Sequence, residues 1–191
     1  VYFDLVPEKM KESFAEHLVR IIEDNGFCLD TGFLATPFLL DSLCRIGRRD
    51  LAYRLLWQDK CPSWLYEVNH GATTIWESWY GYDNDGNPGS LSFNHYAFGA
   101  VDDWMFRNIG GIDTDTPGFR HLIFHPVTDS GITSCCRTFD TVYGLAKCRW
   151  EIKDDTFEMD ITVPCNTTAT VILPDGSSED VGSGDYHYTM T

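Results

Sequence analysis

The chain has 191 residues, of which 43% are hydrophobic, so it is long enough for one large globular domain or two small ones. Its formal net charge is −15, which argues against binding to duplex nucleic acid or to an anionic membrane surface. No apolar run approaches the roughly 20 residues that span a bilayer, so a transmembrane segment is not expected.

The first 115 residues carry apolar side chains at helical spacing. Met10, Phe14 and Leu18, for example, recur every fourth residue. Helices are expected over residues 8–24, 36–47, 50–57 and 93–109, with a further short helix starting within residues 72–79. Because these helices follow one another without intervening strands, we expect paired α-hairpins.

Residues 110–118 are rich in glycine and other turn formers and indicate a domain boundary. Short strand-like runs follow at regular spacing, over residues 119–125, 132–141, 146–152, 156–163 and 168–173, with a weaker run within 180–188. Pro174-Asp175-Gly176 has the composition of a hairpin turn. We therefore expect a helical domain over residues 1–115 and an antiparallel β-sandwich over residues 116–191.

The seven cysteines cannot all pair within the chain, and the neighbours Cys135 and Cys136 would point to opposite faces of a strand. There is no Cys-x-x-Cys motif, so a zinc site is not indicated. The chain opens with Val1 and shows no signal peptide. Reduced thiols and this opening favour a cytoplasmic location, and no cofactor is indicated.

One motif has the composition of a carbohydrate site. Residues 71–79, Gly-Ala-Thr-Thr-Ile-Trp-Glu-Ser-Trp, place Glu77 between Trp76 and Trp79. Sugar C–H faces stack on aromatic rings, and a carboxyl group can transfer protons at the anomeric carbon. The spacing fits equally well with two core tryptophans beside a surface glutamate.

Three further residues could contribute to such a site. His95, in Asn94-His95-Tyr96, could donate a hydrogen bond to a sugar hydroxyl or could be satisfied by a neighbouring backbone group. Trp64 and Tyr66, which follow Pro62, could line a sugar pocket or pack at its rim.

Two acidic stretches have a superficial likeness to cation sites. Residues 83–87 alternate oxygen-bearing side chains with Gly86, but the twelfth position of this calcium-like loop is Asn94 instead of glutamate. Asp102 and Asp103 are neighbours in a helix, where adjacent side chains do not face each other. No metal site is therefore expected.

A set of motifs occurs in a fixed order along the helical half. The set comprises Thr31-Gly32-Phe33 with Thr36-Pro37, Asp50–Leu56, Pro62–Tyr66, Gly71–Trp79, Phe93–Gly99 and Asp103-Trp104. In this order the motifs resemble the C-terminal part of bacterial α-L-rhamnosidases of glycoside hydrolase family 78. The resemblance covers nearly the whole chain. It implies an α+β multidomain fold, a partial (α/α)6 barrel of about five helices followed by a C-terminal β-sandwich.

The resemblance also implies a function, the inverting hydrolysis of terminal α-L-rhamnose from a glycoside or oligosaccharide. Glu77 takes the position of the family's general base, and His95 that of its sugar-contacting histidine. Trp76, Trp79, Trp64 and Tyr66 are expected to bind substrate. Ser78 and Tyr80 depart from the family pattern, because many members carry an arginine and an acid there, which leaves substrate details open.

The family's general acid lies upstream of the matched motifs. The chain is therefore expected to be a fragment of a longer enzyme and to be inactive alone. Two other functions stay open: a carbohydrate-binding region in which the sandwich is the active part, and a structural domain whose exposed barrel helices support self-association. The concentration of tryptophan in the helical half argues against a carbohydrate-binding role of the sandwich.

Overall fold

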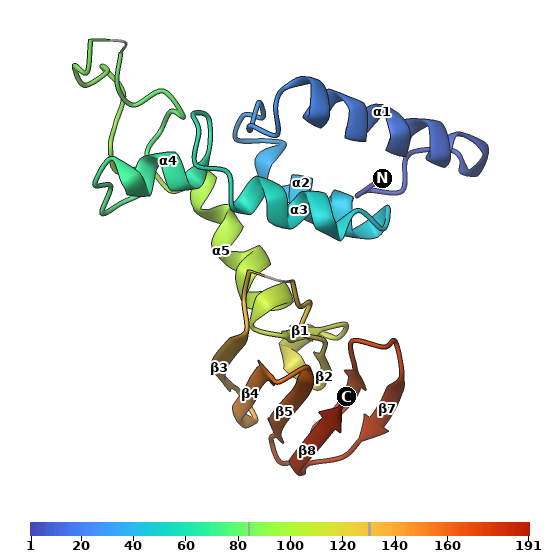
Figure 1. Cartoon of the computed structure of the whole chain (residues 1–191). Coiled ribbons are helices and arrows are strands. Elements are labelled where there is room, and N and C mark those ends of the chain that lie inside the picture. Colours follow the sequence, from blue (N-terminus) through green and yellow to red (C-terminus); the bar gives the residue numbers. More distant parts are fainter. Residues whose placement is uncertain (84, 130) are drawn as a thin grey trace. The chain divides into compact units, whose positions relative to one another are not determined.

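The computed structural model describes residues 1–83, 85–129 and 131–191. The chain forms two compact units, Val1–Val101 and Asp102–Thr191 (Figure 1). Among the described residues, no helix is both long and apolar enough to cross a bilayer.

The first unit is helical. Its helices are α1 (Lys11–Asp24), α2 (Thr36–Arg45), α3 (Arg49–Leu56) and α4 (Trp64–Asn69), with a 3-10 turn at Glu8–Met10. The inner faces of α2 and α3 bury Leu40, Leu43, Leu51 and Leu55, each at most 3% exposed. This burial is the hydrophobic gain that stabilises short helices which would be marginal in isolation.

Helix α4 was not expected from the sequence. At six residues it is too short to show helical periodicity, and it begins because the Ser63 hydroxyl accepts a hydrogen bond from Tyr66 N at 3.0 Å. The short helix expected within residues 72–79 is absent, and this expectation was wrong. The backbone groups of that segment bond to distant parts of the chain instead.

The last helical segment begins later than expected, at Ala97 instead of Phe93. It starts as a 3-10 turn (Ala97–Ala100), continues as α5 (Val101–Trp104) and ends as a π-helical turn (Met105–Ile109). The Asn94–Tyr96 stretch stays outside it, because His95 N donates to Ile75 O at 2.8 Å.

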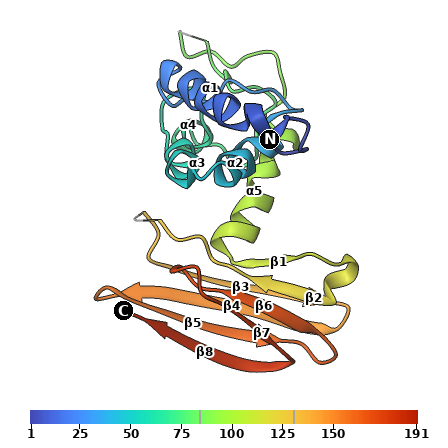
Figure 2. The same ribbon diagram turned by 90° about the vertical axis from the view of Figure 1, so that its right-hand side faces the viewer.

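The second unit contains two four-stranded sheets, with strand orders β1-β2-β6-β7 and β3-β4-β5-β8 (Figure 2). The strands are β1 (Ile112–Thr114), β2 (His121–Phe124), β3 (Ser134–Thr141), β4 (Gly144–Lys153), β5 (Thr156–Val163), β6 (Thr168–Ile172), β7 (Ser178–Val181) and β8 (Gly184–Met190). All strand pairs are antiparallel except β2–β6, in which Leu122 lies beside Ala169.

The core of this unit follows from alternation along the strands. On β5, Phe157, Met159 and Ile161 are buried while the residues between them face outward. Trp150 on β4 is 1% exposed, and its indole N–H donates to Ile109 O at 2.8 Å. The expected sandwich architecture is confirmed, with the parallel β2–β6 pair and strand β1 as additions. The domain boundary expected at residues 115–116 stays a prediction.

Candidate functional site

Glu77 lies in an irregular segment, residues 75–79, that is paired with residues 92–95. Glu77 N donates to Ser92 O at 2.9 Å, and Ser92 N donates to Glu77 Oε2 at the same distance. The His95–Ile75 bond closes the other end of this pairing. A charge-assisted bond from a backbone N–H holds a carboxylate in a defined direction. The Glu77 side chain is partly exposed, so it is fixed at one oxygen and open to solvent.

His95 presents a defined hydrogen-bond donor. Its Nδ1 atom accepts from Ala97 N at 3.2 Å, so the neutral ring carries its proton on Nε2. The ring stacks on Phe33 at a centroid distance of 4.9 Å and on Tyr96 at 5.0 Å. Tyr96 is 87% exposed. The imidazole is therefore held by two aromatic neighbours with its Nε2–H available to a ligand.

Trp76 is enclosed by aromatic rings. Its indole is 3% exposed and makes edge contacts with Phe93 at 5.0 Å, Tyr82 at 5.4 Å and Tyr66 at 6.4 Å. Tyr66 is partly exposed. A hollow of about 200 Å³ lies beside this cluster, lined by Trp76, Ser78, Tyr80, Gly81, Gly89, Ser90, Leu91, Ser92 and Phe93.

Trp79 and Trp64 are also buried, each at 6% exposure. Trp79 stacks on Phe98 at 3.7 Å and donates its indole N–H to Thr31 O, and Trp64 donates to Phe98 O. Their donors are thus engaged by protein carbonyls. Trp76 and the Trp64–Trp79 pair thus pack in two separate aromatic clusters, and the contact of these three indoles with sugar stays a prediction.

Sequence reasoning missed Glu67 on α4. Its side chain is 2% exposed, and Oε2 accepts a hydrogen bond from Trp76 N at 3.1 Å. Oε1 has no hydrogen-bond partner among the described residues. Burial raises the pKa of this carboxyl to about 7. The residues around Glu67 were visible as a motif, but only the fold shows that its side chain points inward.

Comparison with known proteins shows the family of the chain. Residues 1–109 match the bacterial alpha-L-rhamnosidase 6 hairpin glycosidase domain, and residues 111–187 match the bacterial alpha-L-rhamnosidase C-terminal domain. The chain belongs to the bacterial α-L-rhamnosidase family.

Individual α-L-rhamnosidases show how much of such a protein the chain represents. It is 40% identical over 190 residues to an α-L-rhamnosidase of Formosa agariphila and 38% identical over 209 residues to one of Streptomyces avermitilis. Each alignment covers 98% of this chain and 20% of the relative. The chain therefore spans about a fifth of the length of the curated relatives it matches.

Two solved α-L-rhamnosidases share the fold. The Streptomyces avermitilis enzyme complexed with L-rhamnose matches 100% of this chain at 37% identity with a TM-score of 0.96, over 21% of its own length. The native enzyme of Aspergillus terreus matches 98% of this chain at 38% identity with a TM-score of 0.93, over 23% of its length. The expected barrel-and-sandwich fold is thereby confirmed.

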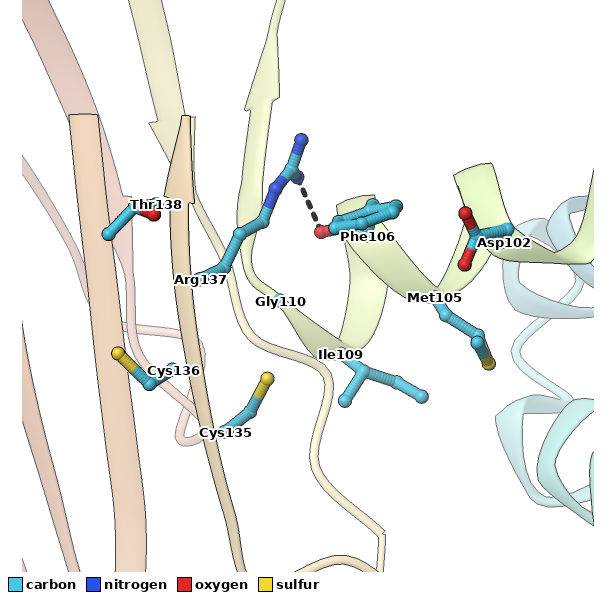
Figure 3. Close-up of a pocket in the computed structure, with 9 residues that line it drawn as sticks. All are labelled: Asp102, Met105, Phe106, Ile109, Gly110, Cys135, Cys136, Arg137 and Thr138. Carbon is cyan, nitrogen blue, oxygen red and sulfur yellow. Dashed lines mark hydrogen bonds between the residues drawn. The ribbon is translucent and has the colours of Figure 1, made fainter. Parts of the chain in front are cut away.

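The second unit of this α-L-rhamnosidase family member contains a larger hollow of about 420 Å³ (Figure 3). Met105, Phe106 and Ile109 line one side of it and Cys135 the other. Arg137 Nη1 donates to Phe106 O at 2.5 Å and to Ile112 O at 2.6 Å, so backbone carbonyls occupy this donor. Its lining contains one carboxylate, Asp102, and one aromatic ring, Phe106.

No group of three or more metal-ligating side chains is present among the described residues. Part of the calcium-like loop, Asn84, lies outside the residues that the structure describes. Asp83 Oδ1 accepts from Asp85 N at 2.9 Å and Asn87 N at 2.8 Å, and these bonds lower the pKa of the Asp83 carboxyl. Asp83 Oδ1 is therefore already engaged by backbone N–H groups of the same loop.

Proposed function

We propose that this chain supplies the general base of an inverting glycoside hydrolase that releases terminal α-L-rhamnose from glycosides. Glu77 is the base, and His95 binds a sugar hydroxyl through Nε2–H. The observation that carries the proposal is the hold on Glu77 Oε2 by Ser92 N, which leaves a partly exposed carboxylate in a fixed direction. The similarity to an α-L-rhamnosidase solved with L-rhamnose supports the choice of sugar.

The proposed reaction uses two carboxyl groups with different tasks. The Glu77 carboxylate takes a proton from water, the water oxygen bonds to the anomeric carbon, and the glycosidic C–O bond breaks. A general acid protonates the departing oxygen. We place this acid in a part of the parent protein outside these 191 residues, at the separation of roughly 6.5–9.5 Å that inversion requires. The isolated chain should then be inactive.

The three tryptophans and Tyr66 complete the proposed site in different ways. Trp76 and Trp79 anchor the Glu77 segment in the core, because both rings are almost fully enclosed. Trp64 holds Trp79 through an edge contact at 5.6 Å. Tyr66 is the ring of this group with more exposed surface, and we propose that it is the one that can contact the sugar or its aglycone.

The experiment uses the full-length protein that carries this chain and an aryl α-L-rhamnoside. Glu77→Gln should lower kcat at least 100-fold with the fold intact, since general base catalysis contributes about 10²–10⁴-fold. Glu158→Gln, an exposed position on β5, is the matched control. A near-normal rate for Glu77→Gln would remove Glu77 from the mechanism.

Azide gives a second, stereochemical test. In Glu77→Ala, azide can replace water without a base, so its addition should restore release of the aryl group and yield a rhamnosyl azide of inverted anomeric configuration. No rescue, or a product of retained configuration, would contradict the assignment of Glu77 as the base on the water side.

A further inference from the structure

Two side chains, one from α4 and one from the loop before it, bond to the main chain of the segment that carries Glu77. Glu67 Oε2 accepts from Trp76 N at 3.1 Å, and the Cys61 thiol donates to Trp79 O at 3.3 Å. Together with the Glu77–Ser92 pair, these bonds tie the segment to two separate parts of the chain. A loop held in this way keeps its shape without secondary structure of its own.

A glutamate is an unusual acceptor for a buried backbone N–H such as that of Trp76. A backbone N–H needs one acceptor, and an amide or hydroxyl side chain would supply it without the cost of burying an acid. Glu67 is 2% exposed, and its Oε1 atom has no partner among the described residues. Its Oε2 atom bonds to Trp76 N, in the residue before Glu77, so the acceptor is directed at the segment that carries the proposed base.

We propose that Glu67 is a positioning residue for Glu77, acting through the Trp76 peptide to set the direction of the Glu77 carboxylate. The proposal rests on the proposed role of Glu77 as general base. Trp76 and Glu77 share a peptide bond, so a shift of Trp76 N moves the backbone from which the base projects. Misplacing a catalytic group by about 1 Å can cost on the order of 100-fold in rate.

The surroundings of Glu67 explain how it can act. Glu67 Oε2 accepts from the Trp76 N–H of the loop 71–79. The Cys61 thiol, in the loop before α4, has its pKa raised first by burial and to a smaller extent by the charges of Cys28 and Glu67. Burial raises the pKa of the Glu67 carboxyl to about 7 and also raises the pKa of the Cys61 thiol. Oε2 can accept from Trp76 N in either protonation state of the carboxyl, so the support does not require a buried charge.

The test is a series of variants in the full-length protein, assayed on an aryl α-L-rhamnoside. Glu67→Met removes the acceptor at similar volume and should lower kcat 10- to 100-fold while KM changes less than threefold. Glu67→Gln keeps an acceptor and should restore kcat to within threefold of the parent. Glu158→Met on β5 is the matched control. If Glu67→Met does not fold, Glu67→Asp replaces it, because the shorter carboxyl should also lower kcat.

A double variant separates positioning from stability. In a Glu77→Gln background, Glu67→Met should cause less than a threefold further loss, because its effect passes through the base. Normal kcat for Glu67→Met and Glu67→Asp beside an inactive Glu77→Gln would overturn the positioning role and leave the proposed function standing. If Glu67→Met lowered kcat by the same factor in the Glu77→Gln background as in the parent protein, the positioning role would also be overturned and the proposed function would stand. An active Glu77→Gln would overturn both.

Discussion

Glu77 and Ser92 bond to each other twice. The main-chain N–H of Glu77 donates to Ser92 O, and the N–H of Ser92 donates to the Glu77 carboxylate, each at 2.9 Å. Ser92, which lies 15 positions after Glu77 in the sequence, thus holds both the backbone and the side chain of the proposed base. In the proposed mechanism, the direction of the Glu77 carboxylate depends on this pair.

Ser92→Pro should lower kcat of the full-length protein about 10- to 100-fold, because proline has no N–H to donate and a hydrogen bond to a charged group contributes roughly 1.5–3 kcal/mol. Ser92→Ala keeps the N–H and tests the hydroxyl, which bonds to Asn94, separately. Steady-state kinetics on an aryl α-L-rhamnoside measures both. Equal losses in the two variants would assign the effect to the hydroxyl instead.

His95→Ala should raise KM about 5- to 30-fold with a smaller change in kcat, because one hydrogen bond to a neutral sugar hydroxyl is worth about 1–2 kcal/mol. His187→Ala on β8, an exposed histidine of the second unit, is the control. Titration with L-rhamnose gives the binding change independently of turnover. Unchanged L-rhamnose affinity in His95→Ala would exclude a sugar contact.

The stability of the first unit should depend on pH through Glu67. Its pKa rises from 4.5 to about 7 on folding, so the folded form favours the protonated acid. The contribution of Glu67 is therefore fully present below pH 4.5, declines between pH 4.5 and 7, and is lost above. At 1.36 kcal/mol per pKa unit the upper bound is about 3 kcal/mol. Urea unfolding at pH 5 and pH 8 measures it.

Glu67→Gln serves as the reference for that experiment, because glutamine does not titrate. The difference between the parent chain and Glu67→Gln cancels the contributions of all other groups. The parent should lose more stability than the variant from pH 5 to pH 8. Parallel pH dependence in the two proteins would mean that Glu67 does not titrate in this range.

Gly81→Ala should destabilise the Trp76 cluster by about 1–3 kcal/mol, the usual cost of overpacking. A Cβ atom at Gly81 would lie 2.4 Å from Trp76 Cε3, which the enclosed indole cannot avoid without moving. Gly182→Ala is the matched control, because nothing lies within 4 Å of its added methyl group. Tryptophan fluorescence during urea unfolding follows both. Equal midpoints would show that the ring can shift freely.

The isolated chain should self-associate through the exposed apolar residues of its N-terminal segment and α1. Leu5 is 83% exposed, Phe14 46% and Ile21 48%. Such a surface in water favours association. Phe14→Lys with Ile21→Lys should shift the chain towards monomer in sedimentation velocity, whereas Val142→Lys, at 86% exposure in the β3–β4 turn, should not. A monomeric parent chain would contradict the proposal.

Local sequence patterns determined most of the elements. Helices α1, α2 and α3 and strands β5 and β6 lie within a few residues of their expected bounds, because their side chains repeat with the period of the element that buries them. The motif around Glu77 was also visible in the sequence, since it depends only on which residues are neighbours. The family followed from the order of such motifs.

The tertiary structure decided what the segment 72–79 does. Its spacing allowed a helix, but its backbone is bonded to Glu67, Ser92 and His95, which lie 9 to 20 positions away in the chain. Bonds between such distant residues leave no periodic trace in the sequence. For the same reason, only the fold shows that the three tryptophans are enclosed and that Glu67 is buried and accepts a hydrogen bond from Trp76 N.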